Sequence, residues 1–137
     1  MASRLRERFW WPVRVYYEDT DLGGVVYYAN YLKFLERARS EWLRHLGVAQ
    51  AGLLASEGLL FAITAVNIRY LLPARFEDEL HVLVELERIR RASMAFRQAI
   101  HRGSSEGELL CTAEVTAACL DAGTLRPKPL PMHLFPE

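Results

Sequence analysis

The sequence lacks an excess of charge of either sign, a long apolar run and a secretory signal. Its 137 residues carry 17 Lys and Arg against 17 Asp and Glu, so the formal net charge is zero. Without a global positive field, nucleic acid is not an expected partner, and an anionic ligand needs a local basic cluster. No segment approaches the roughly 20 apolar residues of a membrane helix. We therefore expect a soluble, cytoplasmic protein that does not insert into a membrane.

Cysteine and histidine are also scarce. Cys111 and Cys119 fall in one strand-like segment, where eight extended residues separate their Cα atoms by roughly 26 Å, too far for a disulfide. They are predicted to be small apolar residues that pack on the same face. The chain has four histidines but no His-x-His or Cys-x-x-Cys motif and no phosphate-binding glycine loop. A metal site or a nucleotide-hydrolysing site is therefore not expected.

The apolar pattern predicts one domain over residues 1–137, with an α+β order of one long helix and then several strands. Strand-like alternation covers residues 11–18, 61–71, 79–89, 93–101 and 109–121, and residues 48–57 allow a short second helix. After the first strand, Tyr31, Leu35, Ala38, Trp42 and Leu46 recur at helical spacing. The residue types of Asn30 and Gly47 favour an N-cap and a C-terminal stop for this helix. The proline-rich tail is not expected to form regular structure.

The segment EDTDLGGVVYYANY, residues 18–31, is the most informative motif. It places two carboxylates and a glycine pair directly ahead of the long helix. A carboxylate can move a proton or attack a carbonyl, and the free N–H groups of a helix N-terminus can stabilise an oxyanion. Acidic and glycine-rich segments are also common in ordinary turns, so spacing alone leaves a structural role open.

The run VRVYYEDTDLGGVVYYANYLKFLERARSEWLR, residues 13–44, resembles the opening of YbgC-type acyl-CoA thioesterases, relatives of 4-hydroxybenzoyl-CoA thioesterase. The later YLLPARFEDEL, residues 70–80, is similar to the same family. The resemblance implies a hotdog fold, in which an antiparallel sheet wraps one long central helix. It also implies hydrolysis of acyl-CoA without a cofactor, since coenzyme A is part of the substrate. Hotdog relatives pair edge to edge, so a homodimer or homotetramer with sites shared between chains is expected.

Carried over by motif, the catalytic carboxylate of the family falls on Asp21, as general base or as nucleophile, whereas Asp19 is expected to be structural. The backbone N–H of Tyr28 matches the position that polarises the thioester carbonyl. Many relatives carry histidine where this chain has Tyr28, and tyrosine is a poor base at neutral pH. Gly24 would permit close approach of substrate to backbone. Asn30 would orient the carboxylate or cap the helix.

Two basic groups are candidates for holding the coenzyme A phosphates. Arg90 and Arg91 follow one predicted strand, with Arg88 just before them, and Arg126 and Lys128 follow the last. Two other functions compete with thioester hydrolysis. A hotdog dehydratase or hydratase generally needs an active-site histidine, which the motif lacks. A non-catalytic module that binds an acyl ligand or a partner would use the same pocket without hydrolysis.

Overall fold

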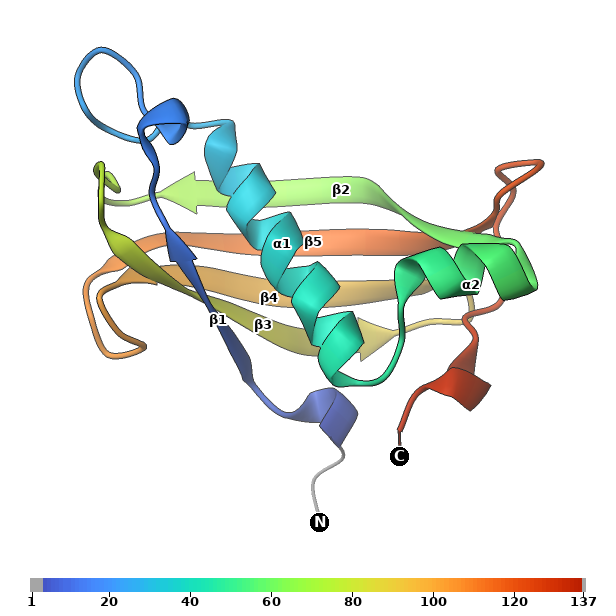
Figure 1. Ribbon diagram of the computed structural model, residues 1–137. Helices are drawn as coiled ribbons and strands as arrows, with labels where there is room; N and C mark the ends of the chain where they lie inside the picture. Colours follow the sequence, from blue (N-terminus) through green and yellow to red (C-terminus); the bar gives the residue numbers. More distant parts are fainter. Residues whose placement is uncertain (1–3, 137) are drawn as a thin grey trace.

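The computed structural model describes residues 4–136 and confirms the α+β order (Figure 1). The strands are β1 (Phe9–Arg14), β2 (Leu59–Tyr70), β3 (Glu79–Ile89), β4 (Ser93–Arg102) and β5 (Leu109–Asp121), and the helices are α1 (Asn30–His45) and α2 (Gln50–Glu57). Three short 3₁₀ turns lie at Arg4–Arg6, Tyr17–Asp19 and Met132–Leu134. In the described part of the chain, no helix is long and apolar enough to cross a membrane.

The five strands form one antiparallel sheet in the order β1-β3-β4-β5-β2. The expected bounds of β3 and β5 agree with the structure. β1 lies earlier than expected, because the extended chain ends at Arg14 and then coils into the 3₁₀ turn Tyr17–Asp19. The alternation expected over residues 11–18 places Tyr17 on the same face as Val13 and Val15, but Tyr17 is exposed whereas both valines are buried. The prediction for Tyr17 was therefore wrong.

Helix α1 packs obliquely across one face of the sheet, which we call the inner face (Figure 1). The five residues of the expected apolar stripe are all buried: Tyr31, Leu35, Ala38, Trp42 and Leu46. Against them lie the alternate side chains of β3, β4 and β5, among them Leu80, Val82, Val84, Phe96, Ile100 and Val115. The helix ends at His45, and Gly47 follows in the left-handed region with φ of 89°, as expected of a stop.

The inner face of β5 also carries the two cysteines. Cys111 and Cys119 are both fully buried and unbridged, as expected. Burial raises the pKa of the Cys111 thiol to about 12, so it carries no thiolate at neutral pH. Further along, Leu130 and Phe135 of the proline-rich tail are buried against this core. The two cysteines are therefore packing residues in this fold.

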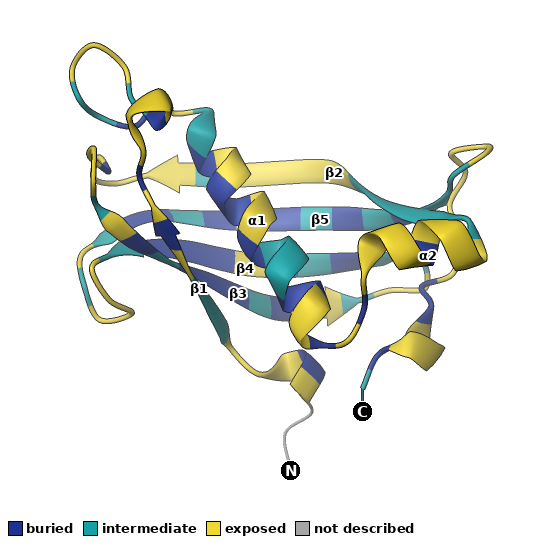
Figure 2. Ribbon diagram, in the orientation of Figure 1, coloured by how far each residue is buried: buried dark blue, intermediate teal, exposed yellow. Residues whose placement is uncertain are grey.

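Strand β2 is the least covered part of the sheet. It lies at one edge, and most of its length is exposed (Figure 2). The apolar side chains of Ile63, Val66 and Tyr70 on this strand have exposed fractions of 44%, 42% and 44%. α1 therefore covers the middle of the sheet and leaves an apolar strip along β2.

Candidate functional site

Residues 16–29, which we call the acidic loop, connect β1 to α1 at one end of the sheet (Figure 1). The loop folds back on itself through a bridge between Thr20 and Val26 and a hydrogen bond of 3.0 Å from the N–H of Asp21 to the carbonyl of Val25. Gly24 closes the turn with φ of 76°, a conformation that side chains disfavour. A Cβ there would meet nothing within 4 Å. The left-handed turn is thus the structural reason for glycine, and its role toward substrate stays a prediction.

The two carboxylates of the loop lie in different surroundings. Asp21 is exposed, and its Oδ1 accepts a hydrogen bond of 2.9 Å from the N–H of Gly23. It lines an open hollow together with the side chains of Tyr17, Leu22 and Phe76. The side chain of Asp19 instead points into the protein, and the residue is only 4% exposed. Of the two acids, Asp21 is therefore the one that can meet a ligand.

The backbone of Tyr28 lies just before the first turn of α1. Its N–H makes no hydrogen bond within the described residues, whereas its carbonyl accepts one of 3.0 Å from the Tyr70 hydroxyl. The exposed Tyr28 ring contacts Tyr27, with ring centroids 4.7 Å apart. A free backbone N–H at the positive end of a helix is suited to an oxyanion. Sequence reasoning missed the part played by Tyr70, which opens the second family motif.

Neighbouring tyrosine side chains are not suited to act as bases. Hydrogen bonding with Tyr28 raises the pKa of Tyr27 above its ordinary value, and burial raises the pKa of Tyr31 and of Tyr70. These three phenols therefore stay protonated at neutral pH and can only donate or accept hydrogen bonds. Asp21 is the exposed carboxylate of the acidic loop that lines the open hollow.

Asn30 does not have the position expected of an N-cap. It is the first residue of α1, the N-cap is Ala29, and no side chain caps the helix. The Asn30 amide instead donates a hydrogen bond of 2.9 Å to Oδ1 of Asp19. The N-cap prediction was therefore wrong, and the carboxylate that Asn30 holds is Asp19.

The four predicted phosphate ligands lie at the same end of the sheet, away from the acidic loop. We call Arg90, Arg91, Arg126 and Lys128 the basic cluster; all four are exposed, and none forms an ion pair within the described residues. A hydrogen bond of 2.8 Å from the Leu130 N–H to the Arg91 carbonyl joins the tail to the β3–β4 turn. The cluster lies where β2 begins, whereas the acidic loop lies where β2 ends (Figure 1).

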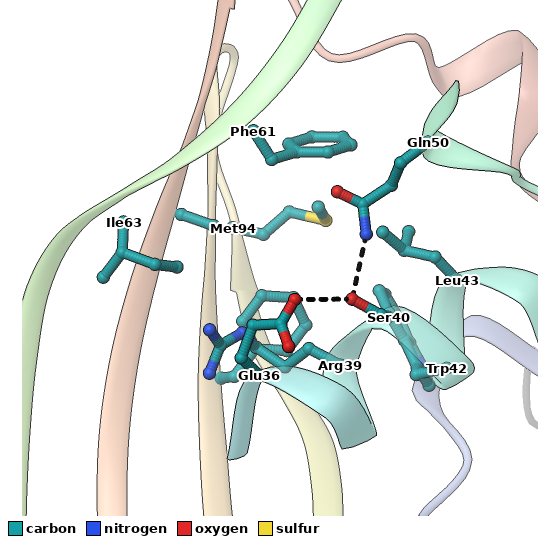
Figure 3. Close-up of a pocket in the computed structure, with 11 residues that line it drawn as sticks. Glu36, Arg39, Ser40, Trp42, Leu43, Gln50, Phe61, Ile63 and Met94 are labelled. Carbon is teal, nitrogen blue, oxygen red and sulfur yellow. Dashed lines mark hydrogen bonds between the residues drawn. The ribbon is translucent and has the colours of Figure 1, made fainter. Parts of the chain in front are cut away.

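A second hollow lies beside the uncovered strip, between α1, α2 and the inner face (Figure 3). One wall is polar: Ser40 donates a hydrogen bond of 3.1 Å to Glu36 and accepts one of 3.1 Å from Gln50. The other wall is apolar and consists mainly of Phe61, Ile63 and Met94. Sequence reasoning did not find this hollow, because it joins residues from several separate elements.

Arg39 also lines the second hollow. It is partly buried, and its Nη1 donates a hydrogen bond of 2.9 Å to the amide oxygen of the fully buried Gln98. Burial lowers the pKa of Arg39 below its ordinary value, although an arginine of this kind stays charged at neutral pH. The hollow therefore combines an apolar wall with a guanidinium.

Across residues 4–136, no group of three or more His, Cys, Asp or Glu side chains is placed so that it could hold a metal ion.

Comparison with known proteins agrees with the geometry. The family model of the thioesterase-like superfamily matches residues 15–135, which include the acidic loop, both helices and four of the five strands in full. This chain belongs to the thioesterase-like superfamily. This chain is 44% identical over 129 residues to the acyl-CoA thioester hydrolase YbgC of Escherichia coli O6:H1, with 94% of each protein covered. It is 43% identical over 126 residues to the acyl-CoA thioesterase YbgC of Haemophilus influenzae, with 92% of this chain and 90% of that protein covered.

A solved structure supports the same assignment. The probable thioesterase from Bartonella henselae is 34% identical and superimposes with a TM-score of 0.85, covering 91% of this chain and all of that chain. The resemblance to YbgC-type thioesterases, the hotdog fold and the enzyme class of thioester hydrolase are thereby confirmed. Which residues carry the reaction is a separate question, which depends on the geometry of the acidic loop.

Proposed function

We propose that this chain hydrolyses acyl-CoA to a free acid and coenzyme A, with Asp21 as base or nucleophile and the Tyr28 N–H polarising the thioester carbonyl. One observation carries the proposal: a single loop presents an exposed carboxylate and a backbone N–H that has no acceptor within the described residues. That N–H lies at the start of a 16-residue helix, whose dipole favours a developing oxyanion. The reaction as proposed needs no cofactor, because water is the second reactant.

Two routes use the same groups. In the general-base route, the Asp21 carboxylate takes a proton from water while the water oxygen attacks the carbonyl carbon. In the nucleophilic route, a carboxylate oxygen attacks, the C–S bond breaks to give a mixed anhydride, and water then hydrolyses the anhydride. In both routes the oxyanion accepts a hydrogen bond from Tyr28, and the departing thiolate takes up a proton. Both routes need a negative charge at position 21.

The position of the basic cluster supports a site built from two chains. The phosphates of coenzyme A need cations. Within one chain, however, the basic cluster and the acidic loop lie at opposite ends of β2, whose 12 residues extend for roughly 40 Å. If the β2 edges of two copies pair antiparallel, the start of each strand lies beside the end of the other. Each acidic loop then lies at the same end of the joined sheet as the partner's basic cluster.

The uncovered strip along β2 supports the same dimer. An exposed edge with apolar side chains such as Ile63 and Val66 favours pairing with another chain. Pairing would also bring the hollow of Figure 3, with its apolar wall, toward the partner's acidic loop, where it can hold the acyl group. A tetramer made of two such dimers is the alternative assembly.

Substitution of Asp21 tests the proposed function. Asp21→Asn keeps the size of the side chain and removes its charge, so we expect kcat for the best acyl-CoA to fall at least about 10²-fold with a modest change in KM. Glu18→Gln is the matched control, because Glu18 is an exposed acid of the same loop and makes no hydrogen bond through its side chain within the described residues. Release of free thiol from a panel of acyl-CoAs is the measurement. Near wild-type kcat in Asp21→Asn would refute the assignment, and negligible wild-type turnover would favour a binding module.

A further inference from the structure

We propose that Asp19 and Asn30 are a pair of positioning residues that fix Asp21 and the Tyr28 N–H relative to each other. The inference rests on the proposed function, which itself assigns no role to Asp19 or Asn30. The Asp19 carboxylate accepts a hydrogen bond of 2.9 Å from the Asn30 amide on Oδ1 and one of 2.9 Å from the Tyr16 N–H on Oδ2. Its backbone carbonyl accepts a third, of 3.0 Å, from the Tyr27 N–H. One residue thus joins the start of the acidic loop, its end and the first residue of α1.

The burial of Asp19 is unusual for a residue that serves only to turn the chain. It is 4% exposed, and it forms no ion pair with any cation in residues 4–136. A buried carboxylate with neutral partners alone costs stability compared with an apolar residue of similar size. A turn does not require that cost. Asn30 supplies the side-chain donor, so the two residues act together.

The three hydrogen bonds act on both groups of the proposed reaction. Tyr28 is held between two residues that Asp19 binds directly, since Tyr27 precedes it and Asn30 follows two residues later. Asp21 lies two residues after Asp19, on the same stretch of backbone. Asp19 therefore determines where the carboxylate lies relative to the N–H donor. An error of about 1 Å between reacting groups can cost about 10²-fold in rate, so this register matters more for kcat than for binding.

Exchanging the two side chains tests the pair. Asn30→Asp alone places two carboxylates against each other, and their repulsion should open the contact. When Asp19→Asn is added, the amide nitrogen introduced at position 19 can donate to the carboxylate introduced at position 30. The amide oxygen at position 19 still accepts from the Tyr16 N–H. Every hydrogen bond can then form again, with one reversed in direction. Asp19→Asn alone should be mild, because the Asn30 amide can turn to present its oxygen.

We expect kcat to fall at least about tenfold in Asn30→Asp and to return within about threefold of wild type in the double variant, with small changes in KM. A stability role alone predicts something different: lower thermal stability for Asn30→Asp, but unchanged kcat well below the unfolding temperature. That outcome, or a double variant no better than Asn30→Asp, would overturn the inference. Glu18→Gln again serves as the matched control.

Amide hydrogen exchange tests the pair without reference to activity. The Tyr27 amide should exchange faster in Asn30→Asp and regain protection in the double variant. Equal protection in all variants would show that the pair does not hold the loop, whatever reaction the protein carries out. If wild type hydrolyses no acyl-CoA, the proposed function fails, and the exchange result still decides whether Asp19 and Asn30 fix the loop. An exchange effect without a kcat effect in an active enzyme overturns the positioning role.

Discussion

Tyr31→Phe should destabilise the protein by breaking a buried hydrogen bond between α1 and the loop that follows β2. The Tyr31 hydroxyl accepts a bond of 2.9 Å from the N–H of Ala74, and both residues are buried, at 3% and 0% exposed. The carbonyl of Ala74 in turn accepts a bond of 2.8 Å from the N–H of Val26 in the acidic loop. Phenylalanine fills the same space but cannot accept a hydrogen bond. The Ala74 N–H would then be buried without a partner.

The expected loss follows from that unpaired donor. A buried N–H left unsatisfied costs about 1–3 kcal/mol of unfolding free energy. For a chain of this length, 1 kcal/mol corresponds to a shift of about 3–4 °C in Tm, so we expect Tm to fall by about 3–12 °C. Urea unfolding at fixed protein concentration is the assay, because self-association would make the apparent stability depend on concentration. The midpoint should fall without a change in the slope m.

Tyr70→Phe is the matched control, since it also removes one phenolic hydroxyl. That hydroxyl donates to the carbonyl of Tyr28, but Tyr70 is 44% exposed and the carbonyl also accepts a bond of 3.3 Å from the Tyr31 N–H. Water can replace the lost donor, so the cost should stay below about 1 kcal/mol. The reasoning is refuted if the unfolding free energy of Tyr31→Phe lies within about 0.5 kcal/mol of the wild-type value, or if Tyr70→Phe is the more destabilised variant.

Three further outcomes are expected. If the basic cluster holds phosphates, KM for acyl-CoA should rise with added salt, whereas KM for a truncated thioester without the nucleotide should not. Equal salt dependence of the two KM values would contradict phosphate binding by the cluster. Sedimentation should show a dimer or tetramer at micromolar concentration, and Val66→Glu on the β2 edge should dissociate it; a stable, active wild-type monomer would contradict shared sites. Gly107→Ala should lower the unfolding free energy of the protein by about 1–3 kcal/mol, because the added Cβ would lie 1.7 Å from the Arg102 carbonyl oxygen. Gly52→Ala should instead raise it by about 0.5–1 kcal/mol, because alanine favours helix α2 more than glycine does. Unfolding free energies that shift in the same direction in both variants would contradict this contrast.

Periodicity predicted most of the secondary structure because burial in this fold follows simple repeats. The stripe from Tyr31 to Leu46 has one buried side, so its spacing is visible in the sequence. β3 and β5 alternate because α1 covers one side of the sheet. The first strand was misplaced because Tyr17 continues the alternation of Val13 and Val15, although the chain has already turned. Alternation alone cannot show where a strand stops.

The loop was less predictable, because its geometry depends on contacts with distant residues. Asp19 and Asp21 are two apart, and in an extended chain they would point the same way. The 3₁₀ turn and the bridge at Thr20 instead turn Asp19 inward and leave Asp21 exposed. Asn30 was expected as an N-cap because its residue type favours that position. Its actual partner is a carboxylate 11 residues earlier, which no local pattern indicates.

Under the proposed function, the separation of the two acids lets one short loop combine rigidity with reactivity. A carboxylate that anchors a loop is most effective when it is shielded from water and accepts hydrogen bonds on both oxygens, whereas one that attacks or takes a proton must be accessible. A single acid cannot meet both requirements, and here Asp19 meets the first and Asp21 the second. Because both lie on one turn, the buried acid fixes the backbone that carries the exposed one. The positions of Asp21 and the Tyr28 N–H therefore depend on a residue that is itself shielded from solvent.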